Sequence, residues 1–589
     1  MAASRRGQPE LQVRLPSSPN AAIPELPPIS ALFLIDFDVK AGYTISWKAS
    51  KPGVELEGVV EYKSLPSGLH TVSEDLIYFV HDGYAGLSAF VNAPVEDSEV
   101  RNARMLAVGV LVPLSYGRLG RAWRHAEGLK TMASTLATST KDIGILEEYW
   151  EKHQAKEESV APVESIESPS VTSQLLPKQP QGHVRNRSTS DGATLLPPGH
   201  RLSAYHPAWS LTKLLDTFGP LIFPIYRAAL LRKRILISCH APVQEACNFV
   251  YDISILSNIP QPIFDLLSPS SPPHRLRPLF SIGVHDIPFL VEDSKHRRNS
   301  DEPLDGDHEA GTGWVACTTD SILAKKDTLW DVLVTLPAPH STKAARRIWP
   351  KIEGPGGIPI RASQRDLRRF RSLKTGLARL SSQFSPGASP TTPRDPTETN
   401  DPFFDEAEEK EVVEPSSWAA LAYNGFMWWA SAGEQAHTEI AEESAHDAEL
   451  LAGMVGSPSS SSAVRMEAPL LSASIASLPP ADPNEAGTEL ALIAYFHRLT
   501  AQVLGTLADV VESDEDDGED DGTAALIDDD DDGAEGRGVR VSSEDVARMG
   551  LDVWSAADAA FLTAAVKAYF GRRAYVEGKG VEICGVRIC

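Results

Sequence analysis

Cysteine is scarce in this chain, which holds five among 589 residues. The five are scattered along it: Cys239, Cys247, Cys317, Cys584 and Cys589. A small scaffold built on disulfide bonds needs far denser cysteines, so that class of protein is excluded. A structural zinc site needs two pairs of Cys or His ligands, and Cys584 and Cys589 have no second pair to complete a set. We therefore predict two ordinary strand cysteines there and no metal site.

Long apolar runs are also missing. The apolar run at residues 31–35 stops at Asp36, too early for a secretory signal. The longest uncharged stretch, residues 415–433, contains Asn424 and Gly425 and is rich in Trp, whereas membrane-spanning helices favour Leu, Ile and Val. We interpret it as a buried helix, with a helix at a membrane interface as the alternative. The sequence predicts a cytoplasmic protein and leaves open a peripheral position on intracellular membranes.

Positive charge is in deficit, since the formal net charge is −25. Fourteen of the acidic residues lie in one tract, residues 512–535, and the rest of the chain is only mildly acidic. This balance argues against a general nucleic-acid-binding protein. Basic residues gather mainly at 361–374, which could form a patch for acidic lipids or an acidic partner. A solvated helix face is the equally weighted alternative.

Signatures of catalysis are poor. Gly354-Pro355-Gly356-Gly357 lacks the Gly-Lys-Ser/Thr that follows in a phosphate-binding loop, so we predict a turn there. Cys239 and His240 are neighbours on a predicted strand, where adjacent side chains point to opposite faces and cannot act as a nucleophile and its base. We expect no catalytic, cofactor-binding or metal-binding residues and no cofactor.

Short runs of β-branched and aromatic residues predict the first folded block, residues 28–150. The expected strands are at residues 31–37, 43–48, 75–81, 87–92 and 105–112, and a helix is expected over 120–150. Five strands and a helix make a small α+β module. We expect this module to pack separately from an α/β lobe that begins near residue 205.

From residue 205, strand-like runs alternate with helical patterns, which predicts an α/β sheet. The expected strands are at residues 235–238, 279–284, 314–318 and 329–336, with helices over 209–231 and after Pro242. The last block is mostly helical. It has an amphipathic helix at 490–511, and a second helix that begins with a capping box at Ser555 and ends at Gly571. A hairpin over 576–589 closes the chain.

Two segments place arginines just before a serine: Arg185-Asn186-Arg187-Ser188 and Arg297-Arg298-Asn299-Ser300. Both lie in stretches with the composition of loops. Ser188 and Ser300 are therefore candidate phosphorylation sites, where an added phosphate could pair with arginines or dock an adaptor. A solubilising loop is the alternative.

Several segments resemble DENN proteins. The opening ALFLIDFDVKAGYTISWK resembles the first strands of the longin module of that family, in which a D–G–I–W pattern recurs; Asp36 or Asp38, Gly42, Ile45 and Trp47 match it. EDLIYFVHDGYAGLSAFVN and ARMLAVGVLVP are similar to the rest of that module. PAWSLTKLLDTFGPLIFPIYRAALLRKRILISC and GWVACTTDSILAKKDTLWDVLVTLP resemble the central DENN lobe. With DVWSAADAAFLTAAVKAYFGRRAYVEG near its end, the chain is similar to the LCHN-like branch, including fungal members with a domain of unknown function.

The resemblance implies an α/β and α+β fold: a longin-like module, a central α/β DENN lobe, a mostly helical C-terminal lobe, and disordered inserts. The expected boundaries are 1–27 (disordered), 28–150 (longin-like module), 151–204 (disordered linker), 205–440 (central lobe with inserts at 291–312 and 375–410), 441–485 (linker) and 486–589 (C-terminal lobe with the acidic insert 512–535).

For function, the resemblance implies a regulator of Rab-type small GTPases in membrane trafficking. Such proteins act as guanine nucleotide exchange factors: they bind the switch regions and promote GDP release. The partner would be a Rab-type GTPase, with peripheral membrane contact left open and no nucleic acid. One alternative is a catalytically silent longin/DENN scaffold in vesicle trafficking. Another is assisted GTP hydrolysis, for which Arg118, Arg572 or Arg573 would be the candidate arginine.

Overall fold

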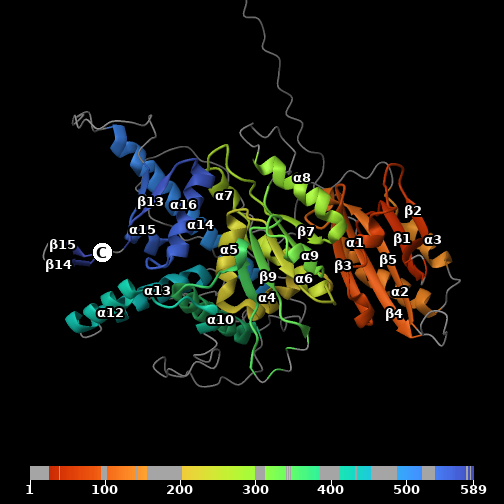
Figure 1. The fold of residues 1–589 in the computed structure, drawn as a ribbon, viewed down its shortest axis with the longest axis horizontal. Coiled ribbons are helices and arrows are strands. Elements are labelled where there is room, and N and C mark those ends of the chain that lie inside the picture. The colour runs from red at the N-terminus through yellow and green to blue at the C-terminus, as the bar shows by residue number, and fades with distance from the viewer. Residues whose placement is uncertain are drawn as a thin grey trace, which may run out of the picture.

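The computed structural model describes residues 26–155, 202–298, 312–384, 410–452, 487–519 and 538–588, apart from short gaps at 39, 41, 95–102, 139–142, between 340 and 345, 432–433, 579–580 and 584–585. A twisted eleven-stranded sheet runs along most of the molecule, and helices cover it (Figure 1). The strand order is β11-β10-β9-β6-β8-β7-β3-β4-β5-β1-β2. The mixed α/β fold with a helical C-terminal part is thus confirmed.

The N-terminal module supplies an antiparallel half-sheet whose five strands were all predicted. They are β1 (Ala31–Asp38), β2 (Gly42–Ser50), β3 (Glu74–His81), β4 (Tyr84–Pro94) and β5 (Ala103–Pro113). Central strand β5 is a nearly continuous apolar run, as expected for a strand buried on both faces. The single helix expected over 120–150 is instead divided into η4 (Ala122–His125), α2 (Ala126–Thr138) and α3 (Gly144–His153). A short helix, α1 (Val60–Lys63), lies in the β2–β3 connection.

The central lobe supplies four parallel strands, again at predicted positions. They are β6 (Ile235–Ser238), β7 (Arg277–Ser281), β8 (Trp314–Thr318) and β9 (Val332–Thr335). Two short antiparallel strands that we did not predict extend the edge: β10 (Lys351–Gly354) and β11 (Ile358–Pro359). Between them Gly356 and Gly357 have φ of 74° and 75°, left-handed values that glycine adopts readily. The turn predicted for this segment is confirmed.

The two half-sheets join where β3 meets β7. The two strands pair at Phe79 and Phe280. The register of β7 against β8 shifts between Pro278 and Phe280, and Phe280 has φ of 59°, which is unusual for a bulky residue. One apolar core runs across both halves. The expectation of separately packed blocks was therefore wrong, because the edge of the N-terminal sheet is used to continue the central one. The expected domain limits stay a prediction.

Helices of the central and C-terminal parts contribute to the main core, which lies on one face of the central sheet. They are α4 (Leu211–Phe218), α5 (Ile222–Leu230), α6 (Gln244–Leu256), α14 (Gly487–Glu519) and α16 (Ala556–Phe570). A second, smaller core on Leu236, Trp314 and Leu333 is covered by α8 (Ile287–Arg298) and α9 (Ser321–Ala324). Helix α16 begins and ends at Ser555 and Gly571, as predicted.

The remaining C-terminal elements form a helical end to the molecule (Figure 1). They are α10 (Gln364–Phe384), α12 (Trp418–Ser431), α13 (Glu434–Ala452), α15 (Ser543–Arg548) and the small strands β12 (Val539–Val541), β13 (Ala574–Val576), β14 (Val581–Ile583) and β15 (Val586–Ile588). Strands β14 and β15 form the predicted closing hairpin, and β13 pairs with β12 instead. Helices α8, α10 and α13 extend into segments expected to be polar inserts or linker.

Helix α12 corrects the interpretation of residues 415–433. The stretch is helical, but it is not buried: Trp418 is 88% exposed and Trp428 is 69% exposed. Only part of the helix packs on the protein, with Ala420 buried and Tyr423 against Trp554. An uncharged sequence predicts burial only when a second surface is available to cover every side of the helix.

Candidate functional site

The surface where the N-terminal module meets the central lobe is the first candidate. It contains a groove of about 260 Å³, lined from the N-terminal module by Lys63 and His81 and from the central lobe by Ile282, Asp286 and Phe289. We call it the joint groove. Two parts of the sequence more than 200 residues apart therefore form one surface.

Polar contacts hold the two sides of the joint groove together. The ammonium of Lys63 lies 2.7 Å from the Asp286 carboxylate and donates a 2.8 Å hydrogen bond to the Val80 carbonyl. Both charged side chains are largely buried, so the pair is screened less than a surface pair. Nearby, Ser67 donates a 2.6 Å hydrogen bond to Asp320. These contacts fix the relative position of α1 and the turn before α8.

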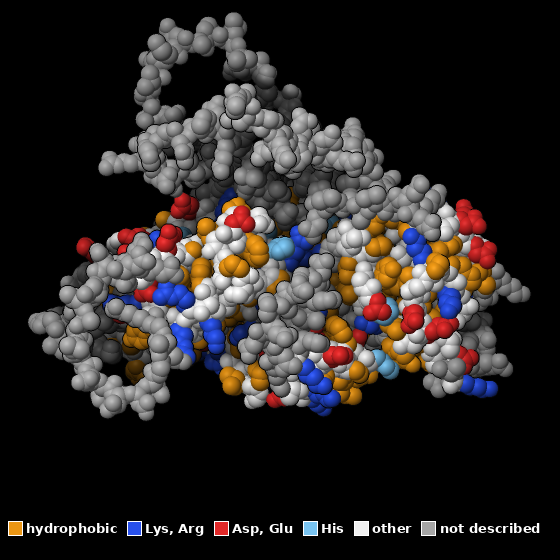
Figure 2. All heavy atoms as spheres, turned by 90° about the horizontal axis from the view of Figure 1, so that it is seen from above, with side chains coloured by type: hydrophobic (Ala, Val, Ile, Leu, Met, Phe, Trp, Pro, Cys, Tyr) orange, Lys and Arg blue, Asp and Glu red, His pale blue; other side chains and the backbone are white. Residues whose placement is uncertain are grey.

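Large apolar side chains remain exposed around this joint. Tyr62 on α1 stacks on His285 with ring centroids 3.8 Å apart, and yet the tyrosine is 48% exposed. Phe289 on α8 is 48% exposed and Ile322 on α9 is 54% exposed. On the face seen in Figure 2, hydrophobic side chains are interspersed with both acidic and basic ones. Aromatic side chains inside a polar rim are typical of surfaces that bind another protein.

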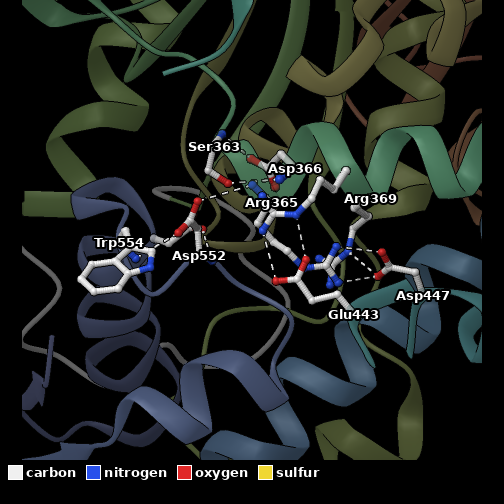
Figure 3. Close-up of polar contacts among 10 residues, drawn as sticks. Ser363, Arg365, Asp366, Arg369, Glu443, Asp447, Asp552 and Trp554 are labelled. Atoms are coloured by element: carbon white, nitrogen blue, oxygen red, sulfur yellow. Dashed lines mark hydrogen bonds and ion pairs between the residues drawn. The ribbon is translucent and has the colours of Figure 1, made fainter. Parts of the chain in front are cut away.

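A buried charge network lies deep in the C-terminal half (Figure 3). Arg227 on α5 binds Asp366 on α10 through two hydrogen bonds of 2.8 and 2.7 Å, and lies 3.2 Å from Asp558 on α16. Arg365 binds Asp447 on α13 in the same two-pronged way, at 2.7 and 2.8 Å. Arg369 shares that carboxylate at 3.2 Å. The paired, planar geometry suits arginine and carboxylate, and it ties four helices together.

The pKa values in the network follow from burial and pairing. Burial opposes the charge on Arg227, but Asp366 and Asp558 outweigh it and the pKa of Arg227 is raised. Burial raises the pKa of Asp558 to about 6, although Arg227 pulls in the opposite direction. Burial also acts on Asp447, but Arg365 and Arg369 hold its pKa below the usual range. Each of these three arginines faces at least one aspartate, and the network thereby connects the helices that carry them.

These contacts correct the expectation for residues 361–374. Neither a surface patch nor a solvated helix face describes Arg365 and Arg369, whose side chains are 3% and 2% exposed. Both guanidinium groups pair with the carboxylate of Asp447, which lies about 80 residues later in the chain. Arg368, on the same helix, has a side chain that is 39% exposed, and it pairs with Glu443 at 2.8 Å.

A further hollow, of about 710 Å³, lies at the carboxyl ends of β6 and β9, and Cys239 and His240 help to line it. Parallel sheets commonly bind ligands at this edge. Cys239 is buried, and its thiol lies 3.5 Å from the Thr318 carbonyl, whereas His240 is exposed. That the two residues do not act as a nucleophile–base pair stays a prediction. Cys247 and Cys317 are also buried, with sulfur atoms 3.6 Å apart.

The other candidate residues do not gather at a site. Arg118 hydrogen-bonds Asn258 at 2.7 Å, and Arg572 binds Asp514 at 2.7 Å. Both arginines thus hold secondary-structure elements together. The candidate phosphorylation sites Ser188 and Ser300 lie outside the described residues, as do Cys584 and Cys589. The joint groove was missed in the sequence because its residues carry no motif.

The described ranges were searched for metal-binding groups and for helices that could cross a membrane. They contain no group of three or more His, Cys, Asp or Glu side chains able to hold a metal ion. They contain one helix, α14, long and apolar enough to cross a membrane. Its most apolar window is 78% buried inside the protein, as is usual for a core helix.

Comparison with known proteins divides the chain into two matched regions. Residues 32–346 match the family of DENN domain-containing protein 11, and residues 413–589 match a domain of unknown function (DUF4484). DENN domain-containing protein 11 of Xenopus laevis is 32% identical over 54% of this chain and 63% of its own length. The Danio rerio protein of that name is 33% identical over 52% of this chain and 53% of its own length.

The chain therefore spans less than two thirds of either vertebrate relative. A longer match, at 24% identity, covers 83% of this chain and 84% of the uncharacterised protein ANR2 of Saccharomyces cerevisiae. The match to the DENN domain-containing protein 11 family covers most of the sheet-forming part, and the match to the domain of unknown function covers most of the helical end.

Proposed function

Because the chain belongs to the DENN domain-containing protein 11 family, we propose that it regulates Rab-type small GTPases as a guanine nucleotide exchange factor. It would bind the switch regions of the GTPase and promote GDP release. DENN proteins in general act this way in membrane trafficking. The LCHN-like branch is the part of the family that we propose for it, with the N-terminal module as its longin module.

The observation that carries the proposal is the rigid joint between the N-terminal module and the central lobe. A shared sheet, the buried Lys63–Asp286 pair and the Ser67–Asp320 hydrogen bond fix the two parts relative to each other. Exposed Tyr62, Phe289 and Ile322 lie around that joint. A partner that contacts both parts would meet a preformed surface, which lowers the entropy lost on binding.

Exchange needs no covalent chemistry from this chain. A surface that binds the nucleotide-free GTPase more tightly than the GDP-loaded form shifts the equilibrium towards GDP loss. The apolar side chains at the joint could provide that difference by packing against a switch segment only in its displaced position. We propose a cytoplasmic protein that works at the periphery of intracellular membranes, where its GTPase would be found.

The test is release of labelled GDP from a panel of purified Rab-type GTPases with the full chain present. We expect at least one GTPase to be accelerated. Phe289→Ala should lower that acceleration about tenfold, as loss of a central aromatic contact does at other interfaces. The matched control is Ile358→Ala, which removes a 66% exposed apolar residue from edge strand β11, whereas the joint lies inside the sheet between β7 and β3.

Two results would overturn the proposal. If no GTPase is accelerated and yet one forms a stable complex, the protein is a catalytically silent scaffold. If Phe289→Ala and Ile358→Ala have equal effects while both fold normally, the joint is not the docking surface.

A further inference from the structure

The outer face of α12 is the most exposed apolar surface among the described helices. Trp418, Leu421 and Trp428 are 88%, 50% and 69% exposed. At about 100° per residue the three side chains fall within about 80° of one another around the helix axis. Ala420, which is buried, and Tyr423, which packs on Trp554, lie on the other side. The helix is therefore apolar on both faces, and the protein covers one of them.

The position of α12 favours contact with a flat surface. Figure 1 shows the helix projecting from the helical end of the molecule, away from the sheet. Trp418, Leu421 and Trp428 are therefore exposed apolar side chains on a projecting helix. Such a helix is well placed to meet an extended plane.

Charge restricts the kind of surface. Residues 415–433 contain no Asp, Glu, Lys or Arg. The next helix, α13, has neither Lys nor Arg. Of its six acidic residues, Glu443 and Asp447 pair with arginines of α10, whereas Glu434, Glu442 and Glu449 are exposed. These exposed carboxylates oppose contact with an anionic surface, and a second copy of the chain would bring the same carboxylates with it.

We infer that the Trp418–Leu421–Trp428 face of α12 inserts into the membrane–water interface of an electrically neutral bilayer, such as one of zwitterionic phospholipid. Tryptophan suits this role, because its ring combines a large apolar area with a polar N–H and is enriched at membrane–water interfaces. Membrane helices of this kind usually add Lys or Arg for anionic lipid, and α12 lacks them. The inference is independent of GDP release, since the joint groove lies in a different part of the fold.

The test uses the full chain and phosphatidylcholine vesicles in a flotation assay. We expect binding, and we expect Trp418→Ser/Trp428→Ser to weaken it about tenfold or more through the loss of apolar area. Replacing part of the phosphatidylcholine by phosphatidylserine should weaken binding as well. Tyr575→Ser is the matched control, because Tyr575 is a 64% exposed aromatic residue on β13.

Quenching of tryptophan fluorescence by brominated phosphatidylcholine tests the unsubstituted protein directly and does not depend on whether the double variant folds. Binding with quenching supports the inference. Absence of binding to neutral vesicles, equal binding by the double variant, or stronger binding to anionic vesicles would overturn it. GDP release measured without vesicles should be unchanged by Trp418→Ser/Trp428→Ser, which separates this inference from the proposed exchange activity.

Discussion

The carboxylate of Asp75 on β3 accepts a 2.7 Å hydrogen bond from the backbone amide of Val243, the residue immediately before α6. Its other oxygen accepts a 3.1 Å bond from the amide of Gln244. A residue of the N-terminal module thus caps a helix of the central lobe 168 residues along the chain. Together with the shared sheet, this cap joins the two parts into one continuous structure.

Asp75→Ala should lower the free energy of unfolding by about 1–2 kcal/mol, the usual cost of losing a helix cap. The change leaves two amides at the start of α6 without their acceptor. Chemical denaturation measures the loss. Glu74→Ala is the matched control, because the neighbouring Glu74 is exposed and its carboxylate pairs with Lys130 at the surface. Equal losses for the two variants would contradict the capping role.

The same carboxylate gives a pH dependence of defined sign. Burial raises the pKa of Asp75 from 3.8 to about 6, although its amide contacts pull it down. Between those two pH values the folded state binds the proton and the unfolded state does not, so stability is lost as pH rises through this window. We expect the wild type, compared with Asp75→Asn, to lose stability between about pH 4 and pH 6. Parallel curves for the two proteins would refute this.

His125 should act in the opposite direction. Its Nε2 donates to the Pro27 carbonyl at 2.7 Å, and its Nδ1 therefore accepts from the Tyr149 hydroxyl at 2.7 Å. Burial lowers the pKa of His125 from 6.5 to about 4. Because the unfolded state takes up the proton first, stability is lost as pH falls from about 6.5 towards 4. His125→Gln should flatten that part of the unfolding curve, and an unchanged slope would show that another group dominates.

Gly550 makes room for the buried charge network. Its φ is 68°, and a Cβ there would lie 1.9 Å from the guanidinium of Arg369. Gly550→Ala should displace that guanidinium from Asp447 and lower stability by roughly 3 kcal/mol or more, as broken buried ion pairs do. Gly53→Ala is the matched control, since Gly53 has φ of 86° and open space around it. Its backbone strain alone should cost about 1 kcal/mol.

The sequence was sufficient to predict where most strands lie, but it was insufficient to predict how the two half-sheets join. β6 and β8 were predicted to the residue, because short buried runs of Val, Ile, Leu and Cys between polar segments have few alternative structures. The union of the two half-sheets depends on one pairing, Phe79 with Phe280, across 200 residues, and no local pattern indicates it.

The errors in the helical end have a common cause. Basic residues such as Arg365 predict exposure, and uncharged ones such as Trp418 predict burial, when each segment is considered alone. Arg365 is buried because Asp447 lies on a helix beside it, and Trp418 is exposed because the described protein covers only the opposite face of α12. The joint groove was not predictable either, since Lys63 and Asp286 become a pair only in the folded chain.

Two deletions of the acidic tract should separate the effect of its charge from the effect of its folded part. The tract was expected to begin at residue 512, but its first residues belong to α14. Helix α14 continues to Glu519, and Asp514 within it binds Arg572 just after α16 at 2.7 Å. Removing residues 520–535 should therefore leave stability and GDP release nearly unchanged, while lowering solubility and the response to salt through the loss of like charges. Removing residues 512–535 should in addition lower stability, because Arg572 loses Asp514 and α14 loses its last turns.

Thermal unfolding and GDP release, measured for both deletions at two salt concentrations, test this prediction. If the shorter deletion lowers exchange as much as Phe289→Ala does, the tract belongs to the GTPase-binding surface and its role is not simply that of a solvated charge run.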